Sequence, residues 1–378
     1  MRGPHRRLAP AETLARIIPL ARAIGVTRLA DVTGLDRIGV PVFQAIRPLS
    51  LSLTVSQGKG ITPDAARVSA LMEAIELDRA ERLAPASFGP ATPAEAALWA
   101  RVPPAFGQVR RFDPGVSRGW VHGTDLLGGG GVRVPHGLVS MDCTAARADD
   151  LWPNTNGLAS GNDALEAQVG ALCEAIERDA HARWLMAAPA ARRATAIDPD
   201  TIDDRAGRWL VAKVRRAGLR CALWDMSGAH GLATIGCAII EPGAAGRLTV
   251  RPALGAGCHP RAPVALARAI VEAAQTRAAL IAGSRDDLSA ADYADPGAQR
   301  SALMFAVRDF GGGPVRRWAA VPDRVLPGAA AERDVLLRAC DDAGCGTVAC
   351  LDLGPSGGPV AVVRVAIPGF GDHHRPAA

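Results

Sequence analysis

Apolar and polar residues follow two rhythms along the chain. Ala-rich segments place apolar residues three and four positions apart, which is typical of amphipathic helices. Shorter runs rich in Val, Ile and Leu are typical of strands. The predicted helices cover residues 11–24, 64–83, 164–186, 263–282 and 331–343, and the predicted strands include 232–240 and 358–369. Because these elements alternate irregularly, the sequence predicts a mixed α/β (α+β) fold.

Stretches rich in Pro and Gly separate the predicted elements. They occupy residues 85–93, 102–115, 126–137 and 354–359, and none is long or low in complexity. Such stretches are typical of loops inside one domain, not of linkers between domains. We therefore predict a single domain over residues 1–378, with its core at about 30–370 and a disordered tail at 371–378.

An internal repeat is the most informative feature of the chain. Residues 66–76, ARVSALMEAIE, recur at 167–177 as AQVGALCEAIE, and a weaker copy, ARAIVEAAQTR, covers 267–277. Each copy follows a glycine-containing loop, SQGKG, NGLASGN or LGAGCHP. A spacing near 100 residues is too long for a solenoid. The pattern instead predicts a loop–helix unit that is repeated around a common centre.

Polar residues of the three copies fall on matched helix faces, because they are spaced by four and then three positions. The matched sets are Ser69, Glu73 and Glu76; Gly170, Glu174 and Glu177; and Arg268, Glu272 and Gln275. For any one helix, a solvated acidic face is the common explanation. Three helices with one shared phase indicate instead that these faces converge on a single site.

Convergence of five glutamates has a chemical consequence. Carboxylates at short range cannot all stay ionised unless a cation compensates their charge. Mg²⁺ takes oxygen ligands, keeps several waters and bridges to phosphates. Arg178 and Arg268 lie on the same elements and would then hold phosphate oxygens. The sequence thus predicts a site for a metal-bound phosphate compound.

The glycine loops match no common phosphate-binding fingerprint. Lys59 in SQGKG is followed by Gly60, whereas a P-loop needs Ser or Thr after its lysine. The segment GLASGND lacks the GxGxxG pattern of a dinucleotide fold. For Lys59, a flexible turn and a direct role both stay open. We therefore expect a nucleotide site built from helix faces and metal-holding carboxylates.

Composition and charge exclude several function classes. The formal net charge of +5 is spread along the chain, which gives no support for nucleic-acid binding. The eight cysteines contain no CxxC pair, and we expect small buried hydrophobes in a reducing cytosol. No segment resembles a signal peptide or a membrane span of about 18 apolar residues. We expect a cytoplasmic protein without a nucleic-acid or membrane partner.

Four segments together resemble the YcaO family of ATP-dependent enzymes, which activate the backbone amides of peptides. They are VTGLDRIGVPVFQAIRP (32–48), SQGKGITPDAARVSALMEAIE (56–76), TNGLASGNDALEAQVGALCEAIERDA (155–180) and ALARAIVEAAQTR (265–277), in the family's order and spacing. The resemblance covers nearly the whole chain. It implies the YcaO-type mixed α/β fold, with a central site for ATP and Mg²⁺.

The resemblance also implies roles for particular residues. The carboxylates that hold Mg²⁺ and phosphate correspond to Glu73, Glu76, Glu174 and Glu177. Further members of the nucleotide site correspond to Ser69, Asn162, Glu166, Arg178, Arg268 and Glu272. Near the N-terminus, RRLAPAETLAR resembles the segment that supplies a basic and a hydroxyl contact, which implies Arg6 or Arg7, and Thr13. No catalytic residue is assigned.

Departures from the common family pattern indicate a branch. The first acidic motif commonly reads ExxER, but here Leu77 follows Glu76, and SALMEAIEL resembles the branch associated with TfuA proteins. The proline-rich C-terminal tail of many azoline-forming members is not found in GFGDHHRPAA. The resemblance therefore favours thioamide formation in a ribosomally synthesised peptide or protein. It implies a peptide or protein substrate, a TfuA-like partner, a sulfide donor and a homodimer.

Two other functions stay open. The first is an azoline-forming cyclodehydratase, in which a substrate side chain takes the place of sulfide. The second is a non-catalytic scaffold that binds a peptide and a partner. Clustered glutamates argue against the scaffold, because burying like charges is costly and a scaffold has no need of them.

Overall fold

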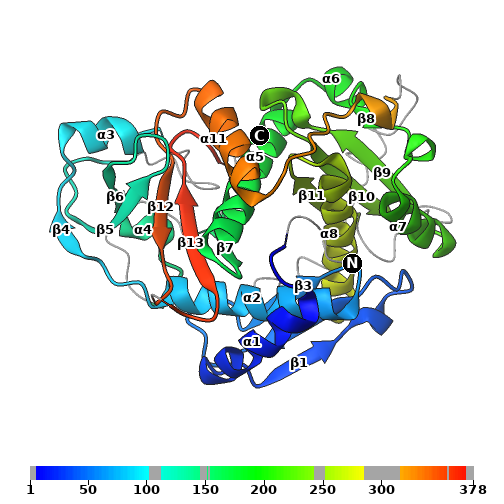
Figure 1. Cartoon of the computed structure of the whole chain (residues 1–378), viewed down its shortest axis with the longest axis horizontal. Helices are drawn as coiled ribbons and strands as arrows, with labels where there is room; N and C mark the ends of the chain where they lie inside the picture. Colours follow the sequence, from blue (N-terminus) through cyan, green and yellow to red (C-terminus); the bar gives the residue numbers. More distant parts are fainter. Residues whose placement is uncertain are drawn as a thin grey trace.

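Antiparallel sheets and helices make up the structure, a computed structural model that describes residues 6–101, 112–144, 151, 154–241, 252–284, 316–355 and 357–371 (Figure 1). One sheet has the order β1 (Arg28–Asp31), β2 (Val42–Ile46), β3 (Val55–Lys59). A second has the order β11 (Ala253–Cys258), β10 (Thr234–Ile240), β9 (Arg220–Asp225), β8 (Ala196–Ile197). The third runs β4 (Ser87–Gly89), β5 (Arg118–Asp125), β12 (Ala349–Asp352), β13 (Ala361–Ala366), β7 (Leu158–Gly161), and β6 (Gly131–Pro135) also pairs with β5.

Long helices connect and cover these sheets. The described helices are α1 (Pro10–Ala23), α2 (Pro63–Glu81), α3 (Pro93–Trp99), α4 (His136–Val139), α5 (Ala164–Met186), α6 (Pro189–Arg193), α7 (Arg205–Arg216), α8 (Ala262–Ala282) and α11 (Ala329–Asp342). In Figure 1, α2 lies across the lower part of the molecule, with α5 and α8 above it. Short 3₁₀ turns occur at Thr33–Leu35, Pro199–Thr201, Ser227–Ala229 and Trp318–Ala320.

Most predicted elements are confirmed, including the mixed α/β fold. The five predicted helices match α1, α2, α5, α8 and α11 to within two residues at each end. The predicted strands at 232–240 and 358–369 contain β10 and β13. The loop prediction is wrong within 85–93, which contains β4, and within 126–137, which contains β6 and the start of α4. Residues 102–111 and 372–378 lie outside the described residues.

The strand β6 explains why glycine content misled that prediction. Val132 and Val134 are two positions apart, so they point to the same face of a strand. Val134 is fully buried in a cluster with Trp99 and Trp120, and β6 pairs with β5 along its length. Burial of this alternating pair outweighs the local preference of the flanking glycines for turns.

The predicted repeat is present as three units, but most of each segment predicted as a glycine-containing loop is a strand, so each unit is a strand followed by a helix. They are β3 with α2, β7 with α5, and β11 with α8. Each of the three strands is the last strand at one edge of its own sheet. Each helix packs on its own strand and also contacts the strand of another unit: α2 contacts β7, α5 contacts β11, and α8 contacts β3. The three units therefore close into a ring.

Glycines allow the helices to lie close to their strands. A Cβ atom at Gly58 of β3 would lie 2.1 Å from the backbone oxygen of Ala66 in α2. The same addition at Gly257 of β11 would lie 2.2 Å from the backbone oxygen of Ala265 in α8. These distances leave no space for a side chain, so glycine sets how close each helix can approach.

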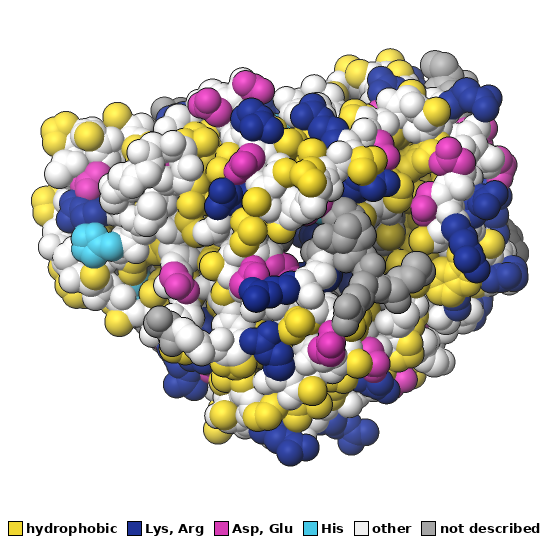
Figure 2. All heavy atoms as spheres, in the orientation of Figure 1, with side chains coloured by type: hydrophobic (Ala, Val, Ile, Leu, Met, Phe, Trp, Pro, Cys, Tyr) yellow, Lys and Arg dark blue, Asp and Glu magenta, His cyan; other side chains and the backbone are white. Residues whose placement is uncertain are grey.

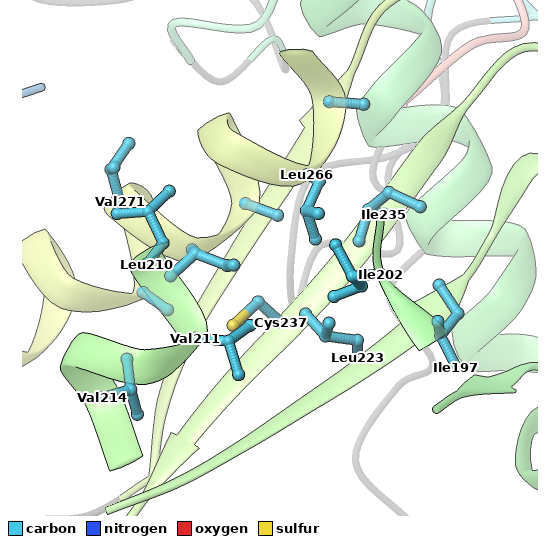
Figure 3. Close-up of a cluster of buried hydrophobic side chains, with 14 of the residues drawn as sticks. Ile197, Ile202, Leu210, Val211, Val214, Leu223, Ile235, Cys237, Leu266 and Val271 are labelled. Atoms are coloured by element: carbon cyan, nitrogen blue, oxygen red, sulfur yellow. The ribbon is translucent and has the colours of Figure 1, made fainter. Parts of the chain in front are cut away.

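Apolar packing fixes the third unit against the sheet that carries it. Figure 3 shows side chains of α7 and α8 directed at the neighbouring strands. This cluster includes Ile197, Leu210, Val211, Val214, Leu223, Ile235, Cys237, Leu266 and Val271. Burial of each Leu, Ile or Val contributes about 1.5–3 kcal/mol.

No helix among the described residues has the length and apolarity needed to cross a bilayer.

The cysteines agree with the sequence prediction with two exceptions. Six of the eight are buried thiols, but Cys221 is half-buried and Cys143 is exposed. Burial raises the pKa of Cys340 well above its ordinary value and that of Cys350 to about 11, so both stay protonated. The buried cysteines therefore behave as small apolar residues.

Candidate functional site

Glutamates of one unit meet the strand of the next unit at the centre of the ring. The Oε1 atom of Glu76 accepts hydrogen bonds from the backbone N and the Oγ of Ser160, at 2.7 and 2.6 Å. The Oε2 atom of Glu177 accepts from the backbone N of Cys258 at 3.0 Å. The structure thus joins α2 to β7 and α5 to β11 through carboxylates that face the centre. Figure 2 shows acidic and basic side chains next to one another near the middle of the face that it displays.

An ion pair joins the third unit to the first. The Nζ of Lys59 lies 3.1 Å from Oε2 of Glu272. The other oxygen of Glu272 lies 3.9 Å from Nη2 of Arg178, which is also 3.9 Å from Glu174 and 3.8 Å from Glu177. One arginine therefore lies among carboxylates of two helices without a short contact to any of these three.

Burial makes the charged form of several glutamates unfavourable. It raises the pKa of Glu76 to about 8, and repulsion from Glu73 and Glu174 adds to the shift. Burial and the charge of Glu272 raise the pKa of Glu177 to about 7. The pKa of Glu174 is also raised by burial, although three arginines oppose the shift. Without a further cation, Glu76 is therefore largely protonated at neutral pH and Glu177 is about half protonated.

Basic groups compensate part of this acidic charge. Burial would lower the pKa of Arg268, but Glu177, Glu272 and Glu174 raise it above its ordinary value. Arg364 of β13 is buried near Glu174, and burial lowers its pKa to about 10. Burial alone would raise the pKa of Glu272, but Lys59 and Arg178 together hold it below its ordinary value.

The site has the properties of one that binds a divalent cation together with phosphate. Five carboxylates on three helices supply hard oxygen ligands, and burial raises the pKa of Glu76 and Glu177, so a further cation would favour the ionised form of both groups. Among the described residues, no group of three or more His, Cys, Asp or Glu side chains is arranged so that it could hold a metal ion. Mg²⁺ suits this arrangement, because it takes one or two carboxylates and completes its shell with waters and phosphates.

A second polar cluster lies at the start of α5. The Nη1 of Arg6 contacts Oε1 of Glu166 at 2.7 Å, and Thr13 Oγ1 donates to Asn162 Oδ1 at 3.0 Å. Asn162 in turn donates to both oxygens of Glu166, at 3.3 and 3.1 Å. Glu166 precedes Glu174 by eight residues, which is about 12 Å along the helix axis. The two clusters therefore lie along one side of α5.

The structure brings together most residues that the sequence singled out. The central group contains Glu76, Glu174, Glu177, Arg178, Arg268 and Glu272, and Glu73 is close enough to affect the pKa of Glu76. Ser69 lies one turn before Glu73 on α2 and is half-buried. Arg7 binds the N-cap residue Asp163 at 2.8 Å, so Arg6 is the basic residue on Glu166. What each residue binds stays a prediction.

Three residues near the site were not assigned from the sequence. Ser160 and Arg364 carry no pattern that marks them, because their place depends on how β7 and β13 lie beside the helices. Lys59 did carry a signal: it is one of two lysines in a chain with 43 basic residues. Its long side chain reaches from β3 to α8, a contact that no local pattern predicts.

The chain belongs to the YcaO family. The family model described as YcaO cyclodehydratase, ATP- and Mg²⁺-binding, matches residues 57–371. A protein of the tfuA 3′ region of Rhizobium leguminosarum bv. trifolii is 36% identical over 97% of this chain and 88% of its own length. A Methanothermobacter thermautotrophicus protein is 32% identical over 96% of this chain and 94% of its own length. The predicted family and its cofactors, ATP and Mg²⁺, are thereby confirmed at the level of the family.

Solved YcaO structures share the fold. A YcaO protein from Methanopyrus kandleri bound with AMPPCP and Mg²⁺ gives a TM-score of 0.73 at 23% identity, over 97% of this chain and 93% of that one. A heterocyclase in complex with substrate and cofactor gives 0.77 at 19% identity, over 97% of this chain and 53% of that one. The Escherichia coli microcin synthetase complex McbBCD gives 0.63 at 14% identity, over 90% of this chain and 88% of that one.

The raised carboxyl pKa values predict how stability depends on pH. Glu76 and Glu177 have pKa values of about 8 and 7 in the folded chain, whereas the ordinary pKa of a glutamate side chain is 4.5. The folded state therefore binds more protons than the unfolded state between these limits, and stability falls as pH rises from about 4.5 to about 8. With a chelator present, we expect the thermal midpoint to fall by several degrees between pH 6 and 8.5.

Two variants test the source of this pH dependence. Glu76→Gln copies the protonated form, so it should flatten the curve of thermal midpoint against pH. Glu95→Gln is the control, because Arg133 lowers the pKa of Glu95 to about 2 and keeps it ionised throughout this range. It should lower the midpoint equally at every pH. A wild-type midpoint that does not change with pH would contradict the assigned pKa shifts.

Proposed function

We propose that this chain activates backbone amides of a peptide or protein by ATP-dependent O-phosphorylation, and that the product is a thioamide. The carboxylate ring with Arg178 and Arg268 carries this proposal, because it combines metal-binding oxygens with groups that hold phosphate. Similarity to a protein of the tfuA 3′ region supports a TfuA-like partner. Sulfide, as the nucleophile, comes from a donor protein or from solution.

The reaction begins with a poor electrophile. A peptide amide resists attack because resonance stabilises it. Hydrosulfide adds to the carbonyl carbon, and the resulting oxyanion attacks the γ-phosphorus of ATP, so that ADP leaves. The phosphorylated oxygen then departs as inorganic phosphate while the S–H proton is lost, and the C=S bond forms. Oxygen is thus exchanged for sulfur, and one ATP is converted to ADP and phosphate.

The side chains of this site act by position and charge. Arg178 and Arg268 hold the oxygens of the transferred phosphoryl group and neutralise the charge that develops there. Glu73, Glu76, Glu174 and Glu177 would hold Mg²⁺, which would offset the negative charge of the phosphate groups. Asn162, Glu166, Arg6 and Thr13 bind the nucleoside end, and Ser69 completes the site on α2. No step requires a covalent bond to the protein.

Azoline formation is the second candidate, and the description of the family model as a cyclodehydratase favours it. In that reaction, a substrate Cys, Ser or Thr side chain attacks the amide in place of sulfide. The phosphorylation and loss of phosphate are otherwise the same. The site residues keep the same roles in both reactions, so the assignment of the ATP site does not depend on which nucleophile is used.

A reconstituted reaction separates these possibilities. The purified chain, a TfuA-like protein and a peptide encoded nearby are incubated with Mg·ATP and sulfide, and ADP and peptide mass are measured. Thioamide formation makes the peptide heavier by the difference between sulfur and oxygen, and azoline formation makes it lighter by one water. A chain that neither binds Mg·ATP nor forms ADP would be a scaffold, and the proposal would be wrong. Light scattering on the same sample measures the predicted homodimer.

A further inference from the structure

Two sets of three residues occupy equivalent positions in the three units of the ring. Glu73 recurs as Glu174 and Glu272 at offsets of 101 and 199 residues. The same offsets relate Lys59 of β3 to Ser160 of β7 and Cys258 of β11. Each of these strand residues contacts a glutamate on the helix of another unit. The contacts follow one cyclic order, so they are equivalent junctions of the ring.

The first two junctions are built alike. Glu76 and Glu177 are equivalent residues of α2 and α5, and each accepts a backbone N–H from the next strand, from Ser160 and Cys258 respectively. A backbone N–H is a neutral donor. It fixes the carboxyl group in place but leaves its negative charge to be compensated by something else.

The third junction departs from this design. Gln275 of α8 stands where the other helices have Glu76 and Glu177, and its buried Oε1 has no hydrogen-bond partner among the described residues. Lys59 instead pairs with Glu272, which lies one turn earlier on α8. In the first two junctions a neutral backbone N–H meets Glu76 or Glu177. In the third junction the ammonium group of Lys59 meets Glu272, which is equivalent to Glu73 and Glu174 instead.

The two carboxylate oxygens of Glu272 face different basic residues. Oε2 lies 3.1 Å from Lys59 Nζ, whereas Oε1 lies 3.9 Å from Nη2 of Arg178. The side chains of Lys59 and Glu272 are 28% and 21% exposed, so the pair is only partly screened by water. Without Lys59, the whole negative charge of Glu272 would act on Arg178 and on any phosphate beside it.

We propose that Lys59 is a positioning residue of the nucleotide site, which acts by holding and neutralising Glu272 so that Arg178 stays available to phosphate. This inference rests on the proposed function, because it assumes that the ring binds Mg·ATP. Loss of the ammonium group would draw Arg178 to Glu272 and leave one more negative charge next to the triphosphate. Both effects weaken nucleotide binding, and both require Glu272 to be charged.

A double-mutant cycle on nucleotide binding tests this role. Titration calorimetry with Mg·AMPPCP measures binding without turnover for wild type, Lys59→Met, Glu272→Gln and the double variant. We expect Lys59→Met to weaken binding by about 10-fold in the wild-type background and by less than about 2-fold when residue 272 is Gln. Lys59→Arg keeps the charge and should bind within about 3-fold of wild type.

Thermal midpoints measured without nucleotide show whether Lys59 positions the nucleotide site or only stabilises the fold. A merely structural lysine would lower the midpoint and would weaken binding equally with Glu or Gln at position 272. That result, or unchanged binding in Lys59→Met, would overturn the role of Lys59. Lys59→Gln gives the same comparison if the Met variant does not fold. A wild-type chain that does not bind Mg·AMPPCP would overturn the proposed function itself, and with it this role.

Discussion

Glu73→Gln and Glu174→Gln should each abolish ATP turnover while the chain keeps its fold. We expect the rate of ADP formation to fall by at least about 100-fold, because each change removes a charged oxygen ligand from the ring that holds metal and phosphate. The amide keeps the size and shape of a protonated carboxyl group. Burial already raises the pKa of Glu174, so a neutral side chain is well suited to that position in the metal-free chain.

The control for these variants lies on α2, the helix that carries Glu73. Asp64→Asn removes a carboxylate from the first turn of α2, where Asp64 pairs with Arg67 on the helix surface. It should leave turnover within about 2-fold of wild type, since exposed pairs of this kind contribute little. Circular dichroism and the thermal midpoint check the fold of all three variants. Near-normal turnover in both glutamate variants would refute the site assignment.

The spacing of residues along the chain was sufficient to predict the helices and the helix faces that carry the glutamates. Helix periodicity placed α2, α5 and α8 within two residues of their observed ends. The shared phase of Glu73, Glu174 and Glu272 indicated a common centre, and the structure places these residues in one charged group. Such predictions succeed because side-chain direction on a helix is fixed by spacing alone.

Contacts between units could not be predicted in the same way. The hydrogen bonds from Ser160 to Glu76 and from Cys258 to Glu177 depend on which strand edge lies beside which helix. Sheet order sets that arrangement, and distant pairings such as β13 with β7 determine the order. Lys59 shows the consequence: its rarity was visible, but its partner Glu272 is 213 positions away in the chain.

The repeat becomes more specific once the ring is known. In the sequence, the repeat showed only that segments of α2, α5 and α8 are equivalent. In the structure, the equivalence extends to the ends of the strands, where Lys59, Ser160 and Cys258 each meet a glutamate of another unit. Three copies of one unit can therefore surround a site with similar elements on three sides. In the unit of β3 and α2, Lys59 stands where the other two units have neutral residues, which makes the site asymmetric. An asymmetric ligand requires an asymmetric site.

Gly58→Ala should strongly destabilise the chain, although it adds one methyl group. The new Cβ would lie 2.1 Å from both the backbone O of Ala66 and the backbone N of Ala70, and backbone atoms cannot turn away as a side chain can. β3 and α2 would have to separate. Overpacking in a tight interior costs about 1–3 kcal/mol and sometimes more, and we expect at least about 2 kcal/mol here.

Gly131→Ala in β6 is the matched control, because a Cβ there meets nothing within 4 Å. It should leave the free energy of unfolding unchanged or slightly higher, since alanine in a strand loses less conformational entropy than glycine. Urea unfolding of both variants gives the comparison. Because α2 carries Glu73 and Glu76, a shift of this helix away from β3 should also weaken Mg·ATP binding below the unfolding range. If Gly58→Ala matches the control in stability, then β3 and α2 do not depend on their close packing, and the ring needs another explanation.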